Sequence, residues 1–73
     1  MKYYFKSPLG TFFISSAPYG GYNLLVNDTV INWADSASEL ALQVYDKTSG
    51  FEEWDNSIIK EKPENLEAWQ VKI

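Results

Sequence analysis

Residues 3–14 of the chain, YYFKSPLGTFFI, are two short aromatic and β-branched runs on either side of a turn that contains Pro8 and Gly10. Aromatic and β-branched side chains favour strands. Proline sets the φ angle that a turn needs, and glycine tolerates positive φ. The stretch therefore predicts a β-hairpin with strands around residues 3–5 and 11–14.

A second hairpin is predicted after a loop over residues 15–21, which is rich in proline and glycine. Residues 22–26 alternate in the manner of a strand, and residues 29–33 form a second apolar run. Asn27 and Asp28 separate the two runs, and both residue types tolerate the left-handed conformation that a two-residue hairpin turn requires. The first half of the chain is thus predicted to form four antiparallel strands.

A helix is predicted next. Ser36 lies three residues before Glu39, which is the spacing of a capping box. The apolar residues that follow fall on one face of a 3.6-residue repeat: Ala37, Leu40, Ala41, Val44 and Tyr45. We expect the helix to cover residues 37–47, with Gly50 as the residue of positive φ that ends it.

The C-terminal part gives weaker patterns. Residues 51–62 read as a loop with one helical turn around Glu52–Asp55. Trp69, Val71 and Ile73 alternate with polar residues, as in a half-buried strand. The predicted fold class is α+β: a small antiparallel sheet of four to five strands, in the order ββββαβ along the chain, with one helix packed on a face.

A length of 73 residues fits a single domain over 1–73. Motifs spread along the chain resemble a group of small uncharacterised bacterial and mobile-element proteins. The residues that carry the resemblance are SPLGTF at 7–12, Asp35-Ser36-Ala37 leading to Val44-Tyr45, Thr48-x-Gly50 followed by Trp54-Asp55, and Pro63-x-Asn65-Leu66-x-x-Trp69. The group has no assigned activity, so the resemblance supports the single domain and implies no catalytic residue.

The composition narrows the function towards binding. The chain has no histidine, cysteine or arginine but twelve aromatic residues, so the usual proton shuttle, thiolate nucleophile and bidentate phosphate reader are missing. A chain of this size has little room for the cleft that catalytic carboxylates need, and residues 46–57 fail the calcium-loop pattern. We therefore expect no enzymatic activity, no catalytic residue, no metal site and no cofactor.

Charge and targeting signals bear on the partner and the location. The net charge of −4 disfavours nucleic acid as a direct partner. The sequence shows neither a secretory signal nor an apolar run of membrane-spanning length, and the absence of cysteine fits a reducing compartment. We expect a cytoplasmic protein, monomeric or homodimeric, that does not interact with a membrane.

The predicted binding site is an acidic, aromatic patch that meets a protein partner with a basic surface. It consists of Phe51, Glu52, Glu53, Trp54 and Asp55, with Tyr19 at a loop tip as a second anchor. Tryptophan supplies apolar contact area at an interface, and surrounding carboxylates steer a cationic partner. The competing interpretation is that Phe51 and Trp54 fold back onto the core. The favoured function is a non-enzymatic protein-binding module, in the form of a phage or mobile-element inhibitor of a host nucleic-acid-handling or defence protein.

Two alternatives remain open. One is a homo-oligomeric structural or accessory protein whose aromatic sheet face pairs with itself. The other is a weak binder of single-stranded nucleic acid, in which aromatic side chains on the strands stack bases. The aromatic residues available for this second alternative are Tyr3, Tyr4, Phe5, Phe12, Phe13 and Tyr22.

Overall fold

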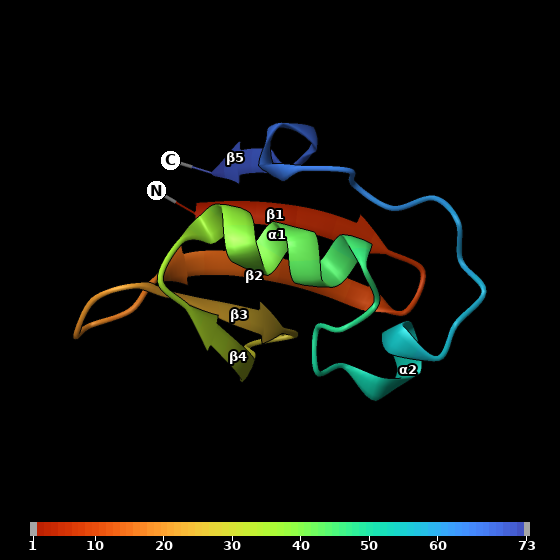
Figure 1. Ribbon diagram of the computed structural model, residues 1–73, viewed down its shortest axis with the longest axis horizontal. Helices are drawn as coiled ribbons and strands as arrows, with labels where there is room; N and C mark the ends of the chain where they lie inside the picture. Colours follow the sequence, from red (N-terminus) through yellow and green to blue (C-terminus); the bar gives the residue numbers. More distant parts are fainter. Residues whose placement is uncertain (1, 73) are drawn as a thin grey trace.

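Figure 1 shows the computed structural model, which describes residues 2–72. The strands are β1 (Lys2–Ser7), β2 (Gly10–Ser16), β3 (Tyr22–Val26), β4 (Thr29–Ala34) and β5 (Gln70–Lys72). The helices are α1 (Ala37–Tyr45), the single turn α2 (Glu52–Asp55) and a 3₁₀ turn, η1 (Leu66–Ala68). The order of the main elements is the predicted ββββαβ.

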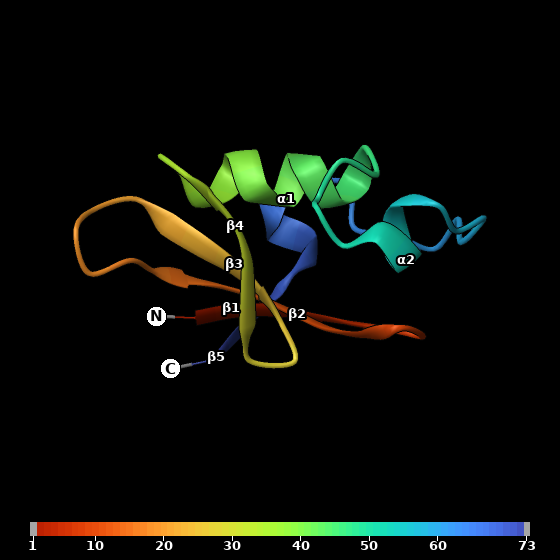
Figure 2. The same ribbon diagram turned by 90° about the horizontal axis from the view of Figure 1, so that it is seen from below.

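All five strands form one antiparallel sheet in the spatial order β4-β3-β2-β1-β5. Figure 2 shows α1, α2 and η1 on the same side of this sheet, and no helix of the described residues on the other side. The α+β prediction is therefore confirmed. A sheet with helices on one face only has one face buried in the core and one face left to solvent.

The second hairpin turns as its sequence predicts. Asn27 and Asp28 have φ angles of 50° and 72°, and positive φ at both central residues is the requirement of a type I′ turn. Beyond the turn the register shifts between Leu24 and Leu25, so β4 carries an extra residue, a β-bulge. The bulge returns Asn32 to the helix side, where its side-chain amide donates to the Gln43 side chain of α1.

The helix α1 begins at its predicted cap. The backbone N–H of Glu39 donates to the Ser36 hydroxyl at 3.2 Å, which satisfies one of the free amides of the first turn. The apolar stripe also lies where the periodicity puts it, since Ala37, Leu40, Ala41 and Val44 are all buried.

The end of α1 differs from the prediction. The helix stops at Tyr45 rather than at residue 47, and Lys47, not Gly50, is the left-handed residue that ends it, with φ of 62°. The N–H groups of Lys47 and Thr48 donate back to the carbonyls of Val44 and Gln43, the pattern of a Schellman motif. Its glycine position is occupied here by a lysine. Gly50 does have a positive φ of 95°, but it lies in the following loop.

The core is built around aromatic rings on the helix side of the sheet. Phe12 lies at its centre, and the rings of Phe5, Phe51, Trp54 and Trp69 have centroids 5.2–6.4 Å from its own. The buried hydrophobic residues are Phe12, Ile14, Leu24, Val26, Ala34, Ala37, Leu40, Ala41, Val44, Trp54 and Trp69. The large rings give this disulfide-free chain its apolar burial.

The last strand corrects another expectation. Trp69 is buried at 4% exposure, but it precedes β5, and all three residues of β5 itself are exposed. The predicted half-buried strand is therefore an exposed edge strand paired to β1. Ile73, the last residue of the predicted alternation, lies outside the described residues.

Candidate functional site

Trp54, the predicted anchor for a partner, belongs to the core. Its side chain is 0% exposed, and its ring lies 5.2 Å from that of Phe12. The indole N–H donates to the carbonyl of Val44 at 2.9 Å, and the Lys47 ammonium lies 4.5 Å from the ring centroid. Because the Trp54 side chain is fully buried, it cannot contact a partner. Phe51 is half-buried against the same cluster, 5.8 Å from Phe12.

Asp55 also has an internal role. Its carboxylate accepts hydrogen bonds from the backbone N–H of Ser49 at 3.1 Å, from the Ser49 hydroxyl at 2.8 Å and from the backbone N–H of Gly50 at 3.0 Å. Bonds to an ionised acceptor are stronger than neutral ones. The Thr48-x-Gly50 and Trp54-Asp55 motifs are thus joined by hydrogen bonds. These bonds hold α2 against the loop that follows α1.

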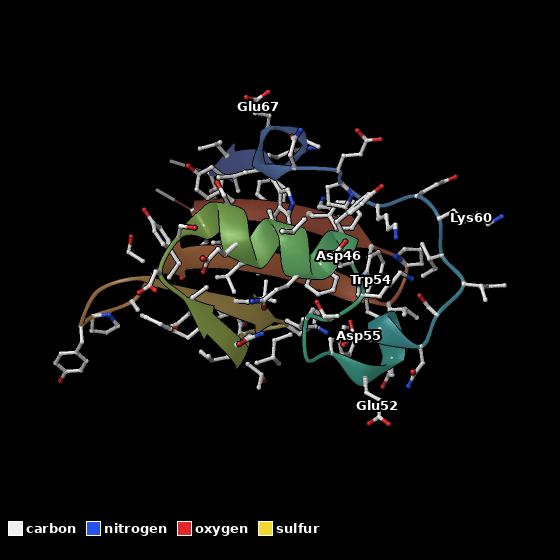
Figure 3. The ribbon with its side chains drawn as sticks, in the orientation of Figure 1. Asp46, Glu52, Trp54, Asp55, Lys60 and Glu67 are labelled. Carbon is white, nitrogen blue, oxygen red and sulfur yellow. The ribbon has the colours of Figure 1, made fainter. Side chains whose placement is uncertain are left out.

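Glu52 and Glu53 are the members of the predicted patch that face solvent. Both are exposed, whereas Trp54 beside them is buried. Figure 3 shows the Glu52 carboxylate pointing away from the molecule, on the opposite side of α2 from Trp54. We refer to Glu52, Glu53 and the backbone of α2 as the acidic turn. Its base is held by the Trp54 and Asp55 hydrogen bonds, while its two carboxylates are exposed to solvent.

Tyr19 does not join this patch. Its side chain is fully exposed on the loop over residues 17–21, between β2 and β3. That loop and α2 lie at opposite ends of the molecule, whose longest extent is 34 Å (Figure 1). The two predicted anchors therefore cannot contact one small epitope together.

A second surface is the face of the sheet that no described helix covers, and we call it the open sheet face. Residues directly opposite one another in a ladder share a face, and the pairing of Tyr4 with Phe13, and of Phe13 with Leu25, defines it. Its members on the five strands are Lys2, Tyr4, Lys6, Thr11, Phe13, Ser15, Asn23, Leu25, Val30, Trp33, Gln70 and Lys72. Three of the chain's six lysines lie on this face and none of its ten acidic residues.

An open hollow of about 370 Å³ lies on this face, lined by Tyr4, Lys6, Thr11, Phe13, Val71 and Lys72. The rings of Tyr4 and Phe13 are neighbours, with centroids 6.3 Å apart, and the Lys2 ammonium lies 5.4 Å from the Phe13 centroid. Both rings are half-buried. The face thus combines adjacent aromatic rings with cationic side chains around a concave surface.

Sequence reasoning missed this surface, although part of its signal was present. Lys2, Tyr4 and Lys6 alternate along β1 and must share a face of any strand. From the sequence alone, the six strand aromatics form one undivided set of candidates for base stacking. The structure divides them: Tyr4 and Phe13 lie on the open sheet face, whereas Tyr3, Phe5, Phe12 and Tyr22 belong to the core or pack against it. The contribution of Lys72 depends on the pairing of β5 with β1, for which the sequence carries no local signal.

Among residues 2–72, the structure brings together no group of three or more side chains suited to hold a metal ion. None of the helices in that range combines the length and the apolar composition needed to cross a membrane. Comparison of the chain with protein-family models, with curated proteins and with solved structures finds no match. The resemblance to small mobile-element proteins accordingly stays a prediction from the sequence motifs.

Proposed function

We propose that the protein is a non-enzymatic binding module whose acidic turn meets a basic surface on a protein partner. The observation that carries this proposal is the way the turn is held. Trp54 is fully buried below it, and Asp55 bonds the backbone of residues 49–50. Glu52 and Glu53 therefore project from a fixed base, and less conformational entropy is lost when a partner orders them.

The excess of acidic residues around the acidic turn also favours a basic partner. Residues 35–67 contain nine acidic residues and three lysines, and their helices lie on one side of the sheet (Figure 2). Two of those lysines are engaged locally, since Lys47 donates to Ser57 and Lys62 lies 4.5 Å from the Tyr45 ring centroid. An acidic layer steers cationic partners and raises their association rate. Proteins that handle nucleic acid carry basic surfaces, and an inhibitor of such a protein, or of a defence protein with a basic surface, is the specific form that we propose.

The test is a charge-reversal experiment on the acidic turn. The double variant Glu52→Lys, Glu53→Lys should lose binding to basic host proteins in a pull-down and to a lysine- and arginine-rich peptide in solution. The matched control is Glu64→Lys, Glu67→Lys, which makes the same change in net charge at two other exposed positions. Asp55 stays unchanged because its substitution disturbs the fold. Equal binding by the two double variants would refute the acidic turn as the contact.

Self-association is a second candidate, favoured by the edge strand β4. This strand contains no charged residue, and Val30 and Trp33 are 54% and 48% exposed. Edge strands without protecting charges readily pair with another chain. Sedimentation velocity over a concentration series should then reveal a dimer that the substitution Val30→Lys abolishes. A single monomeric species at every concentration would contradict this candidate.

A further inference from the structure

The open sheet face differs in charge from the rest of the molecule. It carries Lys2, Lys6 and Lys72 and, among the described residues, no acidic side chain, in a chain whose net charge is −4. We propose that this face binds single-stranded nucleic acid. Bases stack on Tyr4 and Phe13, and the three lysines pair with the phosphates. This inference is independent of the acidic turn, which lies on the helix side.

The first support is an unfavourable charge arrangement that an anionic ligand would relieve. Lys2 and Lys72 are direct cross-strand partners in the β1–β5 ladder, and both side chains are exposed. Like charges directly opposite each other destabilise a sheet, and here they do so on a strand of only three residues. A phosphate between the two ammonium groups converts this repulsion into attraction. Binding of an anion would therefore remove the unfavourable interaction that this pair causes in the free protein.

The second support is the position of the aromatic rings. Tyr4 and Phe13 lie side by side, with centroids 6.3 Å apart, and both line the hollow together with Lys6 and Lys72. Aromatic side chains on a sheet stack unpaired bases, and flanking cations follow the backbone of a single strand. A poly-acidic peptide would pair with the lysines but has no aromatic rings to stack on Tyr4 and Phe13. The combination therefore favours a nucleic acid strand.

The net negative charge of the protein does not prevent this binding. The molecule is about 20 Å thick, whereas the Debye length is about 10 Å at 0.1 M salt. The acidic residues of the helix side are thus largely screened from a ligand on the opposite face. The net charge of the whole chain disfavours nucleic acid. A ligand on the open sheet face, however, interacts mainly with the local positive charge of that face.

The experiment measures the fluorescence anisotropy of labelled single-stranded DNA and RNA oligonucleotides as the protein is titrated at about 0.1 M salt. A poly-glutamate peptide and a duplex of the same sequence are the comparison ligands. We expect binding to single strands, weaker binding to the duplex and little to the peptide. Because the face has three lysines, the slope of log Kd against log salt should be about 2, from about 0.7 per phosphate contact.

Four variants locate the site. Tyr4→Ala and Phe13→Ala should each weaken binding about 5- to 150-fold, the range that corresponds to the loss of one stacked base. Their controls are Tyr19→Ala, which removes an exposed tyrosine elsewhere, and Lys60→Gln, which removes an exposed lysine of the C-terminal loop (Figure 3). Both controls should bind as the wild type does.

The variant Lys72→Glu tests the site with a substitution that should not destabilise the protein, in case the aromatic variants unfold. It puts a carboxylate opposite Lys2 in place of the repelling ammonium, so the free protein should keep or raise its melting temperature while binding falls at least tenfold. A melting temperature that drops together with binding would indicate a structural role for Lys72 and overturn the proposal. So would absence of binding by the wild type, equal affinity for poly-glutamate, or equal losses in the control variants. The double variant of the acidic turn should leave this binding intact, which separates failure here from failure of the proposed function.

Discussion

Phe12 and Phe13 are neighbours in the sequence and have opposite surroundings in the structure. Phe12 is 0% exposed at the centre of the aromatic core, whereas Phe13 lies on the open sheet face beside Tyr4 and under the Lys2 ammonium. The pleat of the strand turns successive side chains to opposite faces. The same residue type therefore holds the fold together on one face and is available to a ligand on the other.

The comparison extends to charge. The helix side combines buried rings with exposed carboxylates such as Glu52, and the open sheet face combines half-buried rings with lysines. The two surfaces lie on opposite sides of the molecule, across the helix layer and the sheet, and differ in the sign of their charge. The net charge of the chain therefore describes neither surface, and each face must be considered with its own partner.

The largest effect should separate the two phenylalanines. Phe12→Ala removes a fully buried ring and should lower the free energy of unfolding by about 3–5 kcal/mol. Phe13→Ala removes a ring that still contacts solvent and should cost about 1–2 kcal/mol. Urea denaturation followed by circular dichroism measures both values. Equal losses would contradict the different roles assigned to the two rings, because Phe13 would then contribute as much to the core as Phe12.

The next effect concerns two acids of the same helical turn. Asp55→Ala leaves three donors of residues 49–50 without their acceptor, and we expect a loss of about 2–3 kcal/mol. Glu53→Ala removes an exposed carboxylate and should change the free energy of unfolding by less than about 0.5 kcal/mol. Thermal unfolding of the two variants measures the difference between the carboxylate that holds α2 in place and the carboxylate on its outer surface. If Glu53→Ala proves as costly as Asp55→Ala, the acidic turn has a structural role that its exposure does not reveal.

The smallest effect compares two buried tryptophans. The indole N–H of Trp54 donates to Val44, whereas that of Trp69 is buried without a hydrogen-bond partner among the described residues. Phenylalanine removes the N–H in both cases, but only Trp54→Phe sacrifices a hydrogen bond. Since a buried polar group without a partner is itself costly, Trp69→Phe should be more stable than Trp54→Phe by about 1–2 kcal/mol. The reverse order of midpoints in urea would contradict the assigned role of the Trp54 hydrogen bond.

Local patterns predicted the hairpins, the helix and the turn α2, because each depends on neighbours in the sequence. Asn27 and Asp28 suit a tight turn in any context, and Ser36 caps the helix through the amide of Glu39, three residues away. The end of α1 escaped this reasoning. A lysine in the left-handed conformation is unfavourable by itself, and Lys47 is held there by the two hydrogen bonds of the helix end and by its contacts with Ser57 and Trp54.

The candidate site was less predictable than the fold, since exposure depends on contacts between distant segments. Phe51–Asp55 reads as an acidic aromatic patch. The structure divides it into two rings in or against the core, one carboxylate bonded to residues 49–50 and two exposed acids. Tyr19 was correctly expected at a loop tip, but its distance from α2 is a property of the whole fold.

Local sequence patterns account for the α+β class, for the aromatic residues available to a core and for the excess of acidic residues, in a chain without histidine, cysteine or arginine. Which aromatic residues are buried, and which charges lie together, depends on contacts between segments that are distant in the sequence. Alternation in a strand assigns residues to two faces, but the packing of α1 against one of them decides which face is the core. The return of β5 beside β1 then brings Lys72 next to Lys2, from the opposite end of the chain.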